Sequence, residues 1–153
     1  MDFLKTAKIR KLWKKMDGER PRRTPSEQGL SRGRRFFEQL VREAVESLPE
    51  ELKNRLENVA FLVREDPPRR SKKWLKNDQE LLGLYHGISH KDRGFWYGNV
   101  LPDRITIYRK PLERVSENSQ ELRENVRQTV VHEVGHYFGF DEEALRRLED
   151  GDF

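Results

Sequence analysis

The chain contains no cysteine. This absence excludes a disulfide framework, and it means that any metal site must use histidine, aspartate or glutamate. Hydrophobic residues are also few, at 34% of the 153 residues against 38% that are charged. The composition therefore predicts a single domain with one lean core, and part of the chain lying outside that core.

Long apolar runs are absent as well. No run approaches the roughly 20 residues that a bilayer-spanning helix needs, and the N-terminus lacks the uninterrupted apolar segment of a secretory signal. We therefore expect a cytoplasmic, bacterial-type protein without a transmembrane segment.

Large apolar side chains are scarce near the N-terminus, where Leu30 is the only one between Met16 and Phe36. The formal charge is +4, and its excess lies in this region. Residues 2–16 have the pattern of a basic amphipathic helix, and residues 17–33 that of a linker. We interpret residues 1–33 as a flexible basic extension. The alternative is a weak contact with nucleic acid or an anionic surface.

Residue patterns predict the elements of a domain over residues 34–153. The domain begins with predicted helices over 34–47 and 50–56. It ends with a long predicted helix from Asn118 to Gly139 and a short one over 141–148. Strands are predicted between them, over 59–63, 81–87 and 104–109. Helices, then strands, then helices indicate an α+β fold.

The segment His-Glu-Val-Gly-His at residues 132–136 holds two of the four histidines of the chain. His132 and His136 lie four apart, so on a helix they share one face and can bind one metal ion. Glu133 is positioned to act as the general base toward a water activated by that metal. Because the surrounding stretch is apolar, these polar groups would be costly there without hydrogen bonds or a metal. The segment therefore predicts a Zn²⁺ site.

A catalytic zinc ion takes three protein ligands and keeps one position open. The third ligand is predicted to be Glu142, which lies three residues after Gly139, where the chain can fold back toward the metal. Asp141 and Glu143 are the neighbouring alternatives. Glu149 is a further candidate, by analogy with zincins whose third ligand comes from a later helix.

Three blocks of the sequence resemble the small bacterial zincin-like metallopeptidase family. They are VVHEVGHYFGFDEE at 130–143, LPDRITIYRKPL at 101–112 and LLGLYHG at 81–87. The resemblance implies a minimal zincin-like fold, with a small mixed sheet packed on helices and a metal-binding helix at the floor of a cleft. It also implies an acidic third ligand at Glu142, where the family usually has aspartate. In zincins an edge strand pairs with extended substrate, and residues 81–85 or 104–109 are the candidates.

The leading functional hypothesis is a zinc-dependent metallopeptidase that acts on peptides or proteins. The same histidine spacing also resembles a bacterial rRNA-maturation endoribonuclease family with a three-histidine metal site. Glu133 and Glu142 both favour the peptidase, because the peptidase needs a base and the endoribonuclease family has histidine in place of Glu142. A zinc-binding protein with little catalytic turnover is the third hypothesis.

Overall fold

The structure is a computed structural model that describes residues 25–75, 79–94 and 101–151. The chain falls into two compact units, Met1–Phe36 and Phe37–Phe153. In the first unit the described residues belong to helix α2 (Pro25–Glu46), and the helix predicted over residues 2–16 lies outside the described part. Residues 25–33 are helical, so their assignment to a linker is wrong. Pro25 suits the first helical position because that position needs no N–H donor.

The second unit contains a mixed sheet of β1 (Val59–Arg64), β2 (Gly83–His86) and β3 (Asp103–Tyr108). The strand order is β1-β3-β2, with β1 parallel and β2 antiparallel to β3. This arrangement confirms the predicted α+β fold with a small mixed sheet. It also shows that the proposed edge role of residues 104–109 is wrong, because β3 is paired on both sides.

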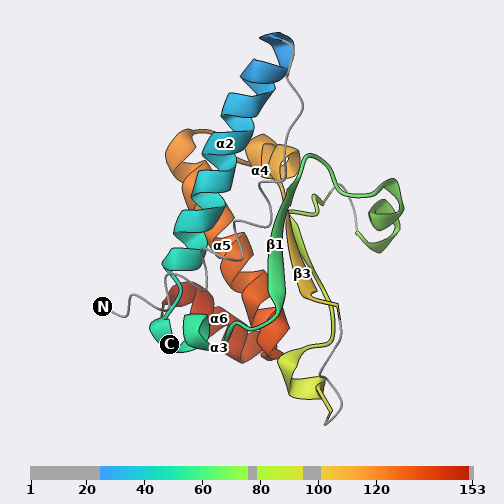
Figure 1. Cartoon of the computed structure of the whole chain (residues 1–153), viewed down its shortest axis with the longest axis vertical. Helices are drawn as coiled ribbons and strands as arrows, with labels where there is room; N and C mark the ends of the chain where they lie inside the picture. Colours follow the sequence, from blue (N-terminus) through green and yellow to red (C-terminus); the bar gives the residue numbers. More distant parts are fainter. Residues whose placement is uncertain (1–24, 76–78, 95–100, 152–153) are drawn as a thin grey trace. The chain divides into compact units, whose positions relative to one another are not determined.

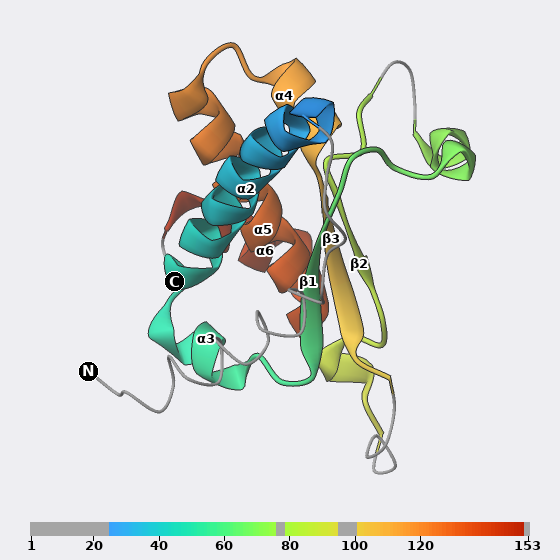
Figure 2. The same ribbon diagram turned by 45° about the horizontal axis from the view of Figure 1, so that its top comes forward.

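Helix α5 (Ser119–Phe138) packs against one face of the sheet (Figures 1 and 2). The buried side chains of the sheet alternate along the strands, as period-two patterning requires; they include Phe61, Val63, Ile105 and Ile107. Both predicted ends of the helix are confirmed. Asn118 Oδ1 accepts hydrogen bonds from the N–H groups of Gln120 and Glu121, and Gly139 adopts the left-handed conformation with φ 75°. Local signals thus define where the helix that carries His132 and His136 begins and ends.

Shorter elements surround this core. They are the helices α3 (Glu50–Arg55), α4 (Arg109–Val115) and α6 (Glu142–Asp150) and the 3-10 turns η1 (Arg69–Trp74) and η2 (His90–Asp92). The structure confirms the predicted helices near residues 50–56 and 141–148. Helix α4 was not predicted. It carries Pro111 in its first turn, the part of a helix that tolerates the missing N–H of proline.

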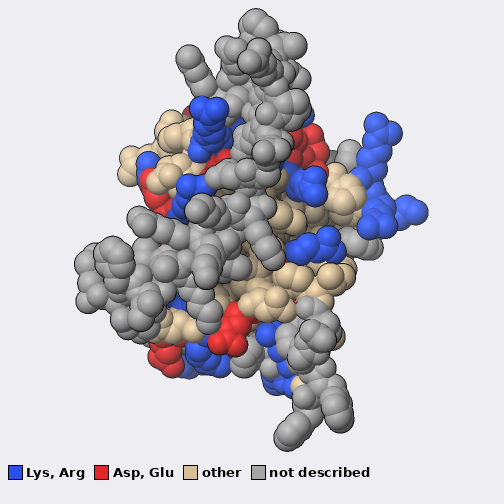
Figure 3. Space-filling model, in the orientation of Figure 1, with Lys and Arg blue, Asp and Glu red and all other residues tan. Residues whose placement is uncertain are grey.

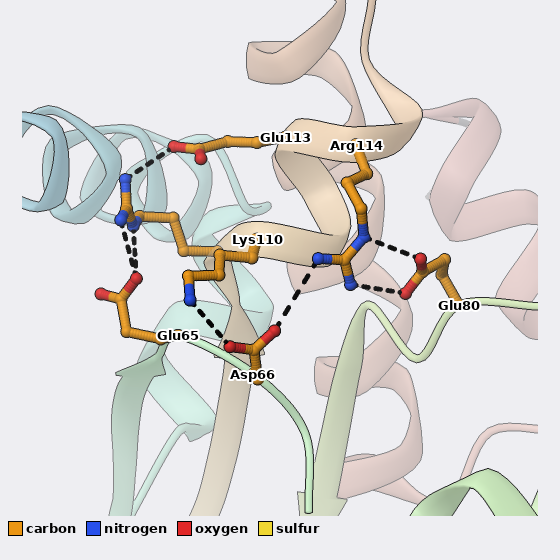
Figure 4. A network of polar contacts seen from close by, with 7 residues as sticks. Glu65, Asp66, Glu80, Lys110, Glu113 and Arg114 are labelled. Carbon is orange, nitrogen blue, oxygen red and sulfur yellow. Dashed lines mark hydrogen bonds and ion pairs between the residues drawn. The ribbon is translucent and has the colours of Figure 1, made fainter.

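An ion-pair network fixes α4 to the chain around the sheet (Figure 4). The buried Arg109 donates to Glu65, just beyond β1, at 2.7 Å and to Glu113 at 2.9 Å. Arg114 donates to Glu80, which precedes β2, at 2.8 Å. These partners come from three segments, which are the residues after β1, the residues before β2 and α4 itself. The network therefore connects α4 to the segments that adjoin these two strands.

Basic side chains are not confined to the N-terminal extension. In Figure 3 they gather over the segment that contains η1, where Arg69, Arg70 and Lys73 are exposed. None of the helices in the described part combines the length and the apolar surface that a bilayer crossing requires.

Tyr137 joins α5 to the chain before β1. Its side chain is fully buried, and its hydroxyl donates to the Glu57 carbonyl at 2.7 Å and accepts from the Glu57 N–H at 3.0 Å. The Arg93 guanidinium lies over the Tyr137 ring at 4.8 Å.

Tyr137→Phe should lower the free energy of unfolding by about 1–3 kcal/mol, because the Glu57 backbone groups lose their partner. Urea denaturation followed by circular dichroism measures this change. Glu57→Ala is the matched control, since it keeps the same backbone groups, and it should lower stability by less than Tyr137→Phe does. Equal losses in the two variants would contradict the role assigned to the hydroxyl.

Candidate active site

His132 and His136, both half-buried, come together on one side of α5. Their Nε2 atoms are 3.0 Å apart, and the two rings are nearly perpendicular at 78°. Two imidazole nitrogens bound to a tetrahedral zinc at about 2.0–2.1 Å are roughly 3.3 Å apart. The observed separation is therefore close to that of a zinc-binding pair, and a nitrogen donor set of this kind fits zinc.

Glu133 points in a different direction from the two histidines, toward strand β2. Only 8% of the residue is exposed, and Oε2 accepts a hydrogen bond from the Tyr85 backbone N–H at 2.7 Å. Burial raises the pKa of the Glu133 carboxyl above its usual range, and the bond from Tyr85 opposes this rise. The carboxylate is consequently held in one place beside the edge of the sheet.

The pairing of β2 with β3 explains why the Tyr85 N–H is available. Tyr108 N–H donates to the Leu82 carbonyl, so the backbone groups of Leu82 face β3. In an antiparallel pair, alternate residues face the partner strand, and Gly83 and Tyr85 therefore face the outer edge. The edge of β2 beside Glu133 thus presents backbone groups in the manner of an extended binding site.

Gly83 allows this close approach of strand and helix. A Cβ atom at residue 83 would lie 2.7 Å from Thr129 Cγ2 and 3.1 Å from Glu133 Cγ, both on α5. A larger side chain would push β2 away from the helix. The glycine is therefore a condition for the hydrogen bond between Tyr85 and Glu133.

Glu149, near the end of α6, contacts His132 of this pair. Its Oε1 atom lies 2.7 Å from His132 Nδ1. Helix α6 reaches this position because Gly135 leaves room for Leu145, whose side chain would collide with a Cβ at residue 135. Arg127 also donates to the Glu149 carbonyl at 3.4 Å.

The other acidic candidates lie at the start of α6. Asp141 is its N-cap and accepts from the Ala144 N–H, and Glu143 pairs with Arg147 at 2.5 Å. Glu142 is exposed, and within the described residues its carboxylate has no hydrogen bond or ion pair. No three His, Asp or Glu side chains of the described part form a group that could hold a metal ion. The structure thus brings together His132, His136 and Glu149 by pairwise contacts, whereas Glu142 stays apart from them as a predicted ligand.

An open pocket of about 290 Å³ adjoins His132 and Glu133. This volume suits a single amino-acid side chain better than a larger ligand. Residues from the β2 segment, from one face of α5 and from α6 line the pocket, namely Leu81, Leu82, Gly83, Asn125, Gln128, Thr129, His132, Glu133 and Glu149. The α5 residues precede His132 by three, four and seven positions, so helical spacing would have pointed to them.

The neighbouring residues Tyr85 and His86 have different surroundings. Tyr85 contributes its backbone to the site, whereas its hydroxyl donates to the buried Asp103 at 2.7 Å. Burial and this carboxylate raise the pKa of the Tyr85 hydroxyl. His86 is exposed at the end of β2.

Comparison with known proteins agrees with this geometry. A family model described as zincin-like metallopeptidase matches residues 56–152, which include the sheet, the two histidines and all of α6. No curated protein matches the chain. Because the matched region covers well over half of the sequence, the chain belongs to the zincin-like metallopeptidase family, whose members are metal-dependent peptidases.

Proposed function

We propose that this protein is a zinc-dependent peptidase in which Glu133 is the general base and His132, His136 and Glu142 hold the metal. When bound, Zn²⁺ acts as a Lewis acid and lowers the pKa of water. The single observation that carries the proposal is the position of Glu133, buried on the metal-motif helix and hydrogen-bonded to the edge strand β2.

The edge of β2 supports a peptide substrate. Gly83 and the Tyr85 carbonyl direct backbone groups outward, while the Tyr85 N–H binds Glu133. An extended peptide recognises such an edge through main-chain hydrogen bonds. The pocket between the β2 segment and α5 opens beside this edge and has room for one substrate side chain. A peptide bound there would present a backbone carbonyl close to Glu133.

The chain's own residues would then perform the proton transfers. Glu133 takes a proton from the attacking water and returns it to the nitrogen of the leaving amine. The Tyr85 N–H holds the carboxylate in position for both steps. No covalent intermediate is required, since water is the nucleophile.

The third ligand is supported by what the neighbouring acids already do. Asp141 caps α6 and Glu143 pairs with Arg147, so metal binding by either would disrupt an existing contact. The Glu142 carboxylate has no such commitment among the described residues. Reaching the histidines requires a change in the turn that follows Gly139.

The double variant His132→Ala/His136→Ala should lose the metal, because it removes both nitrogen ligands. Wild-type protein should contain about one zinc per chain, as one catalytic site requires, and elemental analysis after purification measures this content. His86→Ala/His90→Ala removes the other two histidines, also four apart, and should retain the metal. A wild-type chain without zinc or another divalent ion would overturn the metal-site proposal.

Glu133→Gln should lower kcat by about 10²–10⁴-fold and leave zinc content unchanged, because only the general base is lost. Cleavage of a degenerate quenched-fluorescent peptide library measures the activity. Glu124→Gln makes the same chemical change on an exposed part of α5 and should retain activity. Equal cleavage by Glu133→Gln and wild type would rule out this mechanism, and no cleavage by wild type would favour a zinc-binding protein with little turnover.

Glu142→Ala should weaken zinc binding by more than about 100-fold, beyond the effect of an outer hydrogen-bond partner. Titration against a competing chelator gives the affinity. Glu143→Ala, one residue further along the same helix, is the matched control and should bind zinc as wild type does. Loss in Glu143→Ala with normal binding by Glu142→Ala would move the ligand assignment to Glu143.

A further inference from the structure

We infer that Glu149 is a positioning residue that holds His132 in the tautomer and orientation needed for metal binding. This inference rests on the proposed function for its purpose, but the contact itself exists without a metal. The Glu149 carboxylate and the His132 ring come from different helices and are 17 residues apart in the chain.

The atoms in contact determine the tautomer. Glu149 Oε1 lies 2.7 Å from His132 Nδ1, a short distance typical of a charge-assisted hydrogen bond. An ionised carboxylate only accepts, so Nδ1 must donate the proton. In a neutral imidazole Nε2 then carries no proton, and its lone pair is available to a metal.

This tautomer matters because of the position of Nε2, the second nitrogen of the His132 ring. His132 Nε2 lies 3.0 Å from His136 Nε2, so the unprotonated nitrogen points to the place where the two histidines converge. The two ring nitrogens would then have separate roles, because Nδ1 binds the carboxylate and Nε2 would bind the metal. Carboxylate–histidine contacts of this kind orient metal ligands and raise their basicity.

The packing of α6 makes the contact a built feature of the fold. Leu145 and Leu148 are buried, and Gly135 on α5 leaves the space that Leu145 occupies. The hydrogen bond from Arg127 to the Glu149 carbonyl fixes the end of α6 from the other direction. Side-chain substitutions at residue 149 leave these backbone and core contacts in place.

This role differs from that of a direct metal ligand, and Gln separates the two. The amide oxygen of Gln can still accept a hydrogen bond from Nδ1, but a neutral amide is a poor zinc ligand. A positioning role therefore predicts that Glu149→Gln largely preserves zinc binding and that Glu149→Ala weakens it by about 10–100-fold. Asp150→Ala, at the next and exposed position of α6, should bind zinc as wild type does.

The experiment uses the full chain and two readouts. Zinc affinity is measured by competition with a chelating dye. The His132 tautomer is measured in the metal-free protein by two-bond ¹H–¹⁵N correlation spectra at about pH 8, where an ordinary imidazole is neutral. Wild type and Glu149→Gln should have protonated Nδ1 and bare Nε2, whereas Glu149→Ala should shift the proton toward Nε2.

Two results would overturn the inference. One is an unchanged His132 tautomer in Glu149→Ala, which would mean that the carboxylate does not position the ring. The other is equally weak zinc binding by Glu149→Gln and Glu149→Ala, which would make Glu149 a ligand. If wild type binds no zinc, the proposed function fails, and the tautomer in the metal-free protein still decides whether Glu149 positions His132.

Discussion

The close approach of the edge strand β2 to helix α5 is the contact on which the site depends. It is possible because residue 83 has no side chain to separate Thr129 and Glu133 from the strand. It brings the outward-facing Tyr85 N–H to 2.7 Å from the Glu133 carboxylate. A buried carboxylate is costly unless hydrogen bonds compensate for the lost water, and β2 supplies such a bond. The same bond aligns the proposed general base with the edge where a peptide would pair.

A second close approach, between α5 and α6, completes the surroundings of the histidines. Here Gly135 makes the space, and the buried Leu145 fills it. The metal motif therefore has a glycine in its middle for a packing reason, because a larger residue would move α6 and with it Glu149. Two glycines thus determine the surroundings of the motif, because Gly83 lets β2 approach Glu133 and Gly135 lets α6 bring Glu149 to His132.

The helices and strands that depend on local sequence signals could be predicted. The asparagine at position 118 and the glycine at position 139 mark the ends of α5, since capping depends on residues within a turn of the helix. Strand patterns at β1 and β3 were equally clear. The helical start at Pro25 and helix α4 were missed, because polar residues there give a weak apolar period. The central place of β3 was also missed, since strand order depends on contacts between segments far apart in the chain.

The sequence by itself determined which ligand types the proposed site can offer. Histidines four apart must share a helix face, and the absence of cysteine restricts a metal to nitrogen and oxygen ligands. Only the tertiary structure decided which partners these residues have. Tyr85 reaches Glu133 across 48 positions, and Glu149 reaches His132 across 17. Spacing cannot encode such contacts, because they follow from how closely a strand and a helix pack on α5, and that distance depends on the side chains between them.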